Sequence, residues 1–399
     1  MIFEIILALL IGIIAGTFTG LAPGIHINLI SVILVSAIDK FQSIPLIALA
    51  SFIVAMSITH TFIDFIPSIF LGAPEEDSFL SLLPGHQLLM EGRGFEAFIL
   101  TLYGSIFAIF VILLFTPIFI YTLPLLYTAL KTILPFLLIF LSLYIVLTDD
   151  NISISLIVFA FAGFLGILTF NLPVKEPLLP LLSGLFGLSG LIISLRNKTL
   201  PKKQKVLPLR DIKLSKSQFL KSAFASAIFA PLCSFLPGIG SGHAATFGSE
   251  FIQQDKRGFL FMLGAVNTII MGLSYVTVYL IGKSRTGTAA AVKDILKEIS
   301  KSDLITIILV IVSAGIISFF LAIFLGRFFA KFLNKINYKY LTFAVMIILL
   351  IVNIIFTNWL GIIVLITSAA LGLFTIHSNS RRINLMAVLI IPAIIYYLF

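Results

Sequence analysis

The chain has 399 residues, of which 60% are hydrophobic and 11% are charged, with a formal net charge of +9. A mean hydropathy of +1.17 excludes a soluble globular domain. Unbroken apolar runs such as FAIFVILLFTPIFIY also exclude a membrane β-barrel, whose strands alternate apolar and polar residues.

Apolar runs long enough to cross a bilayer recur along the chain. We therefore expect an all-α polytopic protein of the cytoplasmic membrane, with about 10–14 membrane segments embedded in the lipid bilayer. The basic residues flank these runs, where they set the topology, so no nucleic-acid partner is expected. The single cysteine, Cys233, excludes an intramolecular disulfide and a cysteine-based metal cluster.

The first half of the chain, residues 1–195, is predicted to form one membrane repeat. Its expected segments are 2–20 with 27–38, 43–60, 62–72 with 78–90, 95–124, 132–148, 153–172 and 178–195. Glu4 stands where a signal peptide would be basic, so the first run is not expected to be a cleavable signal.

A basic cytoplasmic linker is predicted at 196–216, and a second membrane repeat at 217–399. The segments expected in this second repeat are 218–236 with 241–253, 259–280, 285–299, 303–330, 340–356, 358–376 and 383–399.

Two short stretches of the first half recur in the second half, in the same order and at a similar spacing. LAPGIHINL (21–29) matches FLPGIGSGH (235–243), and each places Pro-Gly inside an apolar segment. IFLGAPEEDS (69–78) matches YLIGKSRTGT (279–288), and each has a Gly followed by charged and small residues. The pattern indicates an internal duplication.

The charges suggest that the two repeats are inverted. If the broken elements of each half are re-entrant hairpins, an odd number of true spans remains in each half, and the second half enters the membrane from the opposite side. Basic residues at 327–339 and 381–382 then lie inside, as the positive-inside rule requires. Residues 283–301 fall outside, so we interpret them as part of a re-entrant element.

The Pro-Gly breaks are predicted to form a substrate site. A half-helix that starts at a break offers free N–H groups and a partial positive charge, which together hold anions. The alternative is a kinked helix sealed by packing. The predicted substrate-binding residues at the two breaks are Pro23, Gly24, His26, Asn28, Pro237, Gly238, Gly240, Ser241 and His243.

Acidic residues in predicted membrane segments are candidates for ion coupling, because such charges are costly in a bilayer. Asp64 lies four residues after His60 on one helix face, as a proton or metal relay or as a pair that satisfies itself. Glu75, Glu76 and Asp77 follow the second break of the first half, either in a coupling site or in a surface loop. We expect no metal and no cofactor, with H⁺ or Na⁺ as the coupling ion.

Two basic residues occupy the matching place in the second half, where Arg285 aligns with Glu75 and Lys283 precedes it. A planar guanidinium suits a carboxylate or phosphate, so both are predicted to bind the substrate. The alternative is a gating salt bridge between the halves. The charged stretches at 149–150, 175–176 and 255–257 are interpreted as solvated loop charges.

The first hundred residues resemble the TctA-type permease subunit of tripartite tricarboxylate transporters. The resemblance rests on the Pro-Gly near the N-terminus and on IPSIFLGAPEEDSFLSLLPGHQLLMEGRGFEAF (66–98), with its tail from Gly85 to Ala97. It implies an ion-coupled carboxylate permease that works with a small membrane subunit. The chain is short for that family, and the acidic residues at 75–77 replace small neutral ones.

Together these features favour a secondary active transporter of an organic anion such as a carboxylate, working by alternating access and without enzymatic activity. The alternative is a translocase of a polyprenyl-phosphate lipid carrier. An intramembrane enzyme is a third interpretation and rests only on His60 and Asp64.

Overall fold

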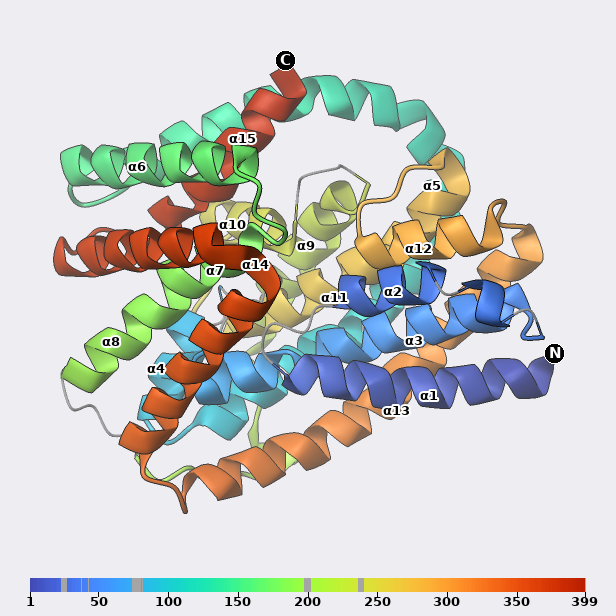
Figure 1. Cartoon of the computed structure of the whole chain (residues 1–399), viewed down its shortest axis with the longest axis horizontal. Helices are drawn as coiled ribbons and strands as arrows, with labels where there is room; N and C mark the ends of the chain where they lie inside the picture. Colours follow the sequence, from blue (N-terminus) through green and yellow to red (C-terminus); the bar gives the residue numbers. More distant parts are fainter. Residues whose placement is uncertain are drawn as a thin grey trace.

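The computed structural model describes residues 1–22, 27–36, 38–41, 43–73, 80, 82–196, 202–235 and 240–398 (Figure 1). Within these ranges every regular element is a helix, as expected for an all-α membrane protein. Eight of the helices are long and apolar enough to cross a membrane, and two shorter apolar helices lie at 132–147 and 382–398.

The first half begins with a long helix, a short returning helix and a buried helix. Its elements are α1 (Ile2–Leu21), α2 (Ile27–Ser36), η1 (Ile38–Phe41), α3 (Leu46–Ile63), η2 (Pro67–Leu71), α4 (Leu82–Met90), α5 (Gly94–Leu147), α6 (Ile152–Asn171), α7 (Leu178–Leu182), η4 (Ser183–Leu188) and α8 (Ser189–Arg196).

The second half opens with a comparable series. Its elements are η5 (Leu209–Asp211), α9 (Lys216–Cys233), α10 (Ser241–Phe251), α11 (Lys256–Ile281), α12 (Gly287–Leu296), α13 (Lys301–Leu333), α14 (Tyr338–His377), η6 (Arg382–Met386) and α15 (Ala387–Leu398). The predicted segment 285–299 contains the short helix α12, and its re-entrant nature stays a prediction.

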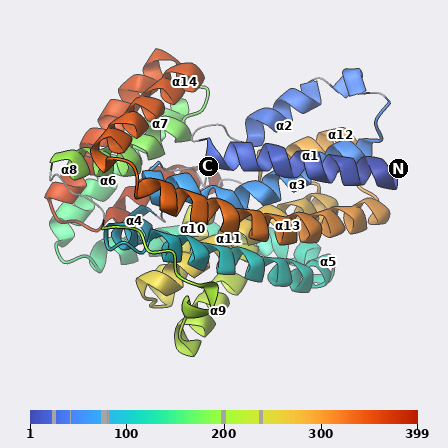
Figure 2. The same cartoon turned by 90° about the horizontal axis from the view of Figure 1, so that it is seen from below.

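Two helices form the centre of the molecule. The most apolar stretch of α11 is 94% buried, and that of α3 with η2 is 83% buried, whereas α1 is only 22% buried. α3 packs mainly against α1 and α13, and α11 packs mainly against α5 and α9 (Figures 1 and 2). Other helices therefore cover most of the surface of this pair.

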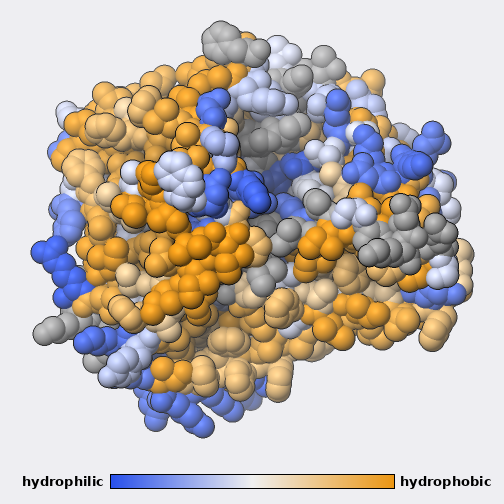
Figure 3. All heavy atoms as spheres, viewed as in Figure 1, coloured by the Kyte–Doolittle hydropathy of each residue, from blue (hydrophilic) through white to orange (hydrophobic). Residues whose placement is uncertain are grey.

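The outer surface is apolar. Large hydrophobic side chains are exposed along α1, α5, α6, α13 and α14. In Figure 3 hydrophobic residues cover most of the visible face, with hydrophilic patches at its lower left and upper right. Such a surface suits lipid contact, since lipid tails are as apolar as these side chains.

The series α1–α2–α3 and α9–α10–α11 share one arrangement. Gly12 of α1 lies against Ala55 and Gly20 lies against Ile63, so α1 and α3 are parallel neighbours, and the intervening chain must return. α9 and α11 are likewise parallel, because Gly258 lies against Gln218, near the start of both helices. The short helices α2 and α10 belong to the two returning segments.

The central helices of the two halves also end alike. The segment of α3 and η2 ends at Gly72 with φ 70°, and α11 ends at Gly282 with φ 62°. Both values lie in the left-handed region, which Gly enters without steric cost, so both glycines stop their helices. These are the two glycines that the sequence comparison aligned. Whether the halves are inverted stays a prediction.

Two predicted boundaries between membrane segments differ from the helix ends in the structure. The segments 95–124 and 132–148 form one helix, α5, which arches around one side of the molecule (Figure 1). Pro117, Pro124 and Pro135 lie inside it, and prolines that bend a helix need not end it. The predicted boundary near 357 is a sharp turn within α14, where Asn358 has φ 69° and ψ −177°.

The interpretation of the charged stretches as solvated loops was wrong for Asp149 and Arg257, whereas the other charges of these stretches are exposed. Asp149 is 6% exposed and accepts hydrogen bonds from Arg381 N–H, Ser380 and Asn384. Burial alone raises the pKa of Asp149, but these hydrogen bonds, with one from Asn151 N–H, outweigh it and lower the pKa.

In the stretch at 255–257, Arg257 forms an ion pair. Arg257 lies 2.9 Å from Glu96, a buried carboxylate that Arg93 also binds at 2.8 Å. These partners lie far away in sequence or on another helix, so the composition of a loop could not reveal them.

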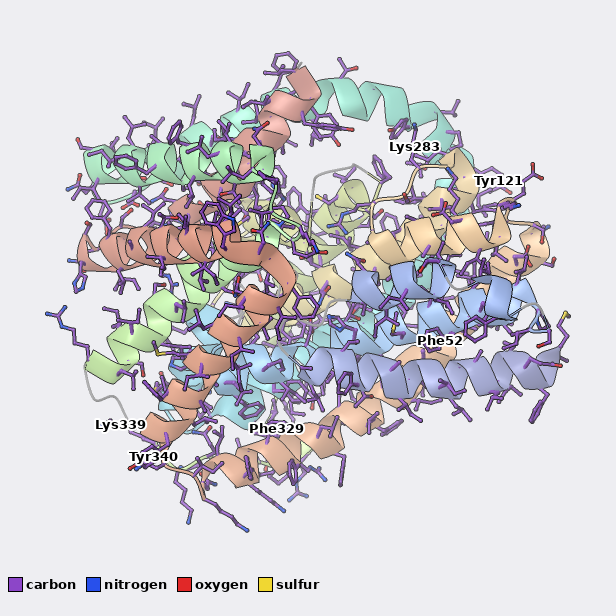
Figure 4. All side chains as sticks on the ribbon, viewed as in Figure 1. Phe52, Tyr121, Lys283, Phe329, Lys339 and Tyr340 are labelled. Carbon is purple, nitrogen blue, oxygen red and sulfur yellow. The ribbon has the colours of Figure 1, made fainter. Side chains whose placement is uncertain are left out.

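The basic linker is partly built into the fold. Gln204 is buried, and its backbone N–H donates to Asn334 at the end of α13. Lys202 N–H donates to Met90 O at the end of α4. The linker and the basic end of α13 therefore lie together, while Lys283 lies at the opposite end of the molecule from Lys339 (Figure 4).

This arrangement predicts the topology. In a Cys233→Ala background, Lys203→Cys should resist an impermeant thiol reagent in intact cells, whereas Lys283→Cys should react. The reason is that the linker follows the positive-inside rule and Lys283 lies at the other end of α11. Labelling is read by mass shift. The reverse pattern would overturn the orientation.

Close glycine contacts predict sensitivity to small changes. A Cβ on Gly264 of α11 would lie 2.0 Å from Thr101 O of α5. Gly264→Ala should therefore lower the free energy of unfolding by about 1–3 kcal/mol through overpacking. Gly190→Ala is the control, because its Cβ would lie 3.8 Å from the nearest atom, Arg382 Nη1. Equal thermal midpoints in detergent for both variants would contradict this.

Candidate functional site

A polar seam runs between the two central helices. Side chains of α3 and α11 pair across it, in an environment that is otherwise apolar and fully buried. The pairs are Ser57–Tyr275 at 2.6 Å, Thr61–Thr268 at 3.0 Å and Asp64–Asn267 at 2.9 Å. Buried polar groups need such partners, because an unpaired one costs about 1–3 kcal/mol.

The order of these pairs gives the direction of the helices. As the residue number rises from 57 to 64 in α3, the partner number falls from 275 to 267 in α11. The two helices therefore run antiparallel where they meet. They also occupy the same place in the two aligned halves.

Arg285 lies against the start of α10. α10 begins at Ser241, and its N-cap Gly240 has an extended backbone. A Cβ on Gly240 would lie 3.0 Å from Arg285 Nη2, so the guanidinium lies against this helix start. His243 Nδ1 accepts from Gly240 N–H at 3.1 Å, which leaves the proton on Nε2. The His243 ring is buried and interacts with the backbone of Leu389.

The start of α12 lies directly after Arg285. Thr286 caps this helix by accepting from Ala289 N–H, and its hydroxyl also contacts Ser274 at 3.0 Å. Asn28 of α2 reaches the same place from the first half, since a Cβ on Gly287 would lie 2.6 Å from Asn28 Oδ1. Residues of both halves thus meet at the start of α12.

The structure brings together part of the predicted site. Arg285, Gly240 and His243 lie at the start of α10, with Ser241 as its first residue, and Asn28 lies at the start of α12. Lys283 is exposed to one side. The predicted residues that lie outside the described part of the chain are Pro23, Gly24, His26, Glu75, Glu76, Asp77, Pro237 and Gly238.

His60 and Asp64 contact different helices. His60 Nδ1 lies 3.0 Å from Thr19 Oγ1 of α1, whereas Asp64 accepts from Asn267 Nδ2 of α11. Within the described ranges no group of three or more His, Cys, Asp or Glu side chains could hold a metal ion. Asp64 remains an ion-coupling candidate as a buried carboxylate in the seam.

Sequence reasoning missed the polar residues of α11. The adjacent pairs Asn267–Thr268 and Ser274–Tyr275 lie seven residues apart in an apolar helix, about two turns, so they share one face. That spacing was the available signal. It does not identify the partner helix, which only the fold supplies.

The seam predicts strong coupling between Asp64 and Asn267. Asn267→Ala should cost about 1.5–3 kcal/mol of stability, because the buried carboxylate loses a hydrogen-bond donor. Asp64→Ala combined with Asn267→Ala should cost less than the sum of the single changes. Thermal unfolding in detergent of the unaltered protein, the two single variants and the double variant gives the double-mutant cycle. Strict additivity of the stability changes would contradict a direct interaction between Asp64 and Asn267.

Comparison with known proteins identifies the family. The sequence matches the tripartite tricarboxylate transporter TctA family over residues 6–387. It is 32% identical over 411 residues to an uncharacterized protein of Methanocaldococcus jannaschii, covering 98% of this chain and 99% of that protein. No solved structure matches the chain. The chain belongs to the TctA family, a family of multi-pass membrane transport proteins.

Proposed function

We propose that this protein is a secondary active transporter that moves an organic anion such as a carboxylate across the cytoplasmic membrane. The observation that carries the proposal is the position of Arg285, against the start of α10 and directly before the start of α12. Membership in a transporter family supports a non-enzymatic role.

The chemistry at Arg285 suits a carboxylate. Helix starts present unsatisfied N–H groups and a partial positive charge, here at α10 and α12. The guanidinium adds a planar fork that matches a carboxylate with two parallel hydrogen bonds. His243, buried at the same helix start, adds a polar ring to the site.

The antiparallel pair of α3 and α11 supports transport by alternating access. Equivalent helices that run in opposite directions are expected if the two halves are inverted repeats. The site at Arg285 also combines residues of both halves, with Asn28 from the first. In an inverted-repeat transporter the substrate lies between such halves, which then rock about it.

Coupling is assigned to H⁺ or Na⁺. Asp64 is fully buried in the seam, and a carboxylate at such a depth can bind a proton or a cation as the transporter changes state. The acidic residues at 75–77 remain in the proposal as a second candidate for coupling. The name of the family also implies partner subunits, so a small membrane subunit is part of the proposal.

The proposal predicts a large effect of Arg285. Arg285→Ala should weaken the apparent affinity for the transported carboxylate roughly ten- to a hundredfold, because a charged hydrogen bond contributes about 1.5–3 kcal/mol. Arg285→Lys should recover part of the loss. Uptake of radiolabelled di- and tricarboxylates into proteoliposomes measures this, with Lys301→Ala, an exposed lysine, as the control.

A gating salt bridge predicts another pattern. Arg285→Glu combined with Glu75→Arg would then restore uptake. That rescue would contradict a substrate-binding role for Arg285. Movement of polyprenyl phosphate without carboxylate uptake would replace the proposed substrate with the lipid carrier.

A further inference from the structure

A cavity of ≈ 380 Å³ lies at the other end of the central helix pair. It is open on one side and is lined by α4, η4 and α8, with Gly72 at the end of η2, Lys256 at the start of α11 and Arg382 at the start of η6. The cavity is thus beside Gly72, whereas Arg285 follows the aligned glycine Gly282. Because α3 and α11 are antiparallel, the two places lie at opposite ends of the seam.

Arg382 is held rigidly in the wall of this cavity. Its Nη2 donates to Leu185 O and Phe186 O, both at 2.9 Å, and to Ser189 Oγ at 3.2 Å. The guanidinium also stacks on the Phe186 ring, 5.3 Å from its centroid. The two carbonyls belong to η4, a π-helical turn, a geometry that is frequent at functional sites.

Two nitrogens of the Arg382 guanidinium make no hydrogen bond within the described structure. Nε is buried without a hydrogen-bond partner, and Nη1 makes no hydrogen bond within the described structure but lies beside Gly190 of the cavity wall. No described carboxylate pairs with Arg382. Glu91, the acidic residue of the lining, lies 3.4 Å from Arg93 instead. An oriented cation without an acidic partner is a site for an anion.

The size and the remaining lining favour a small anion. A volume of ≈ 380 Å³ suits a compact di- or tricarboxylate. Lys256 is an exposed cation at the rim, and His86 and Gln87 of α4 add polar groups. The end of α4 contacts the basic linker through Lys202, so the cavity lies near the predicted cytoplasmic side.

We propose that this cavity is a second anion-binding station, in which Arg382, assisted by Lys256, holds a carboxylate-bearing small molecule at the cytoplasmic end of the seam. The identity of the anion as the transported one rests on the proposed function. The binding itself does not, because it depends only on the residues of this cavity.

Protection of a cysteine in the cavity tests the proposal. Gln87 lines the cavity and is exposed, so Gln87→Cys in a Cys233→Ala background gives a single reporter for a small charged thiol reagent. Citrate is the probe, applied to the full chain in phosphatidylcholine liposomes. Citrate should slow the labelling of Gln87→Cys and leave Lys205→Cys, outside the cavity, unchanged.

Variants then assign the protection to the cation. Arg382→Ala should raise the citrate concentration for half-protection at least tenfold, Arg382→Lys should raise it less, and Lys256→Ala by roughly threefold. Protection should persist with Arg285→Ala, which separates this station from the site at Arg285. Absence of protection in the otherwise unaltered reporter protein, or equal protection with and without Arg382, would overturn the proposal. So would protection by added phosphatidylglycerol alone, because a lipid headgroup would then be the occupant.

The two proposals fail differently. Protection without carboxylate uptake would remove the proposed function and keep the station. Uptake that depends on Arg285 without protection at Gln87→Cys would keep the function and remove the station.

Discussion

The pairing of buried polar side chains between α3 and α11 is the constraint on which the rest of the structure depends. Two helices inside an apolar protein carry serines, threonines, an aspartate, an asparagine and a tyrosine, and each of these groups is costly unless it is paired. The pairs Ser57–Tyr275, Thr61–Thr268 and Asp64–Asn267 form between the two helices in an antiparallel register. This register places Gly72 and Gly282 at opposite ends of the pair.

The two anion sites that we propose follow from this geometry. Each lies just beyond the end of one central helix, and each combines an arginine with residues of a short helix. Arg285 lies against backbone at a helix start, whereas Arg382 is fixed by carbonyls and keeps Nε and Nη1 available. An anion passing between the ends would meet a cation at each, with Asp64, the carboxylate that we propose for coupling, in the seam between them.

Sequence patterns predicted the parts of this arrangement that depend on local chemistry. Gly72 and Gly282 were recognisable because charged and small residues follow an apolar run, and both end their helices in the left-handed conformation. The turn at Asn358 was visible as a gap between two apolar runs.

Long-range pairing escaped prediction for a physical reason. Asp149 looked like a loop charge, yet its partners Ser380, Arg381 and Asn384 lie more than 200 residues away. Arg382 was interpreted as a cytoplasmic loop charge that sets topology. Nothing in the sequence shows that it donates hydrogen bonds to carbonyls of η4. Local pattern located the helix ends at Gly72 and Gly282, although it missed the continuity of α5. The partner of a buried charge depends on the whole fold.

The most direct test of the account is a structure determined with a bound bromosuccinate, whose bromine marks the ligand. The account predicts the carboxylate within hydrogen-bond distance of the Arg285 guanidinium, at the start of α10 and close to Gly240 and His243. A protein that transports dicarboxylates but binds the bromine-marked ligand away from Arg285, or loses no ligand density in Arg285→Ala, would contradict it.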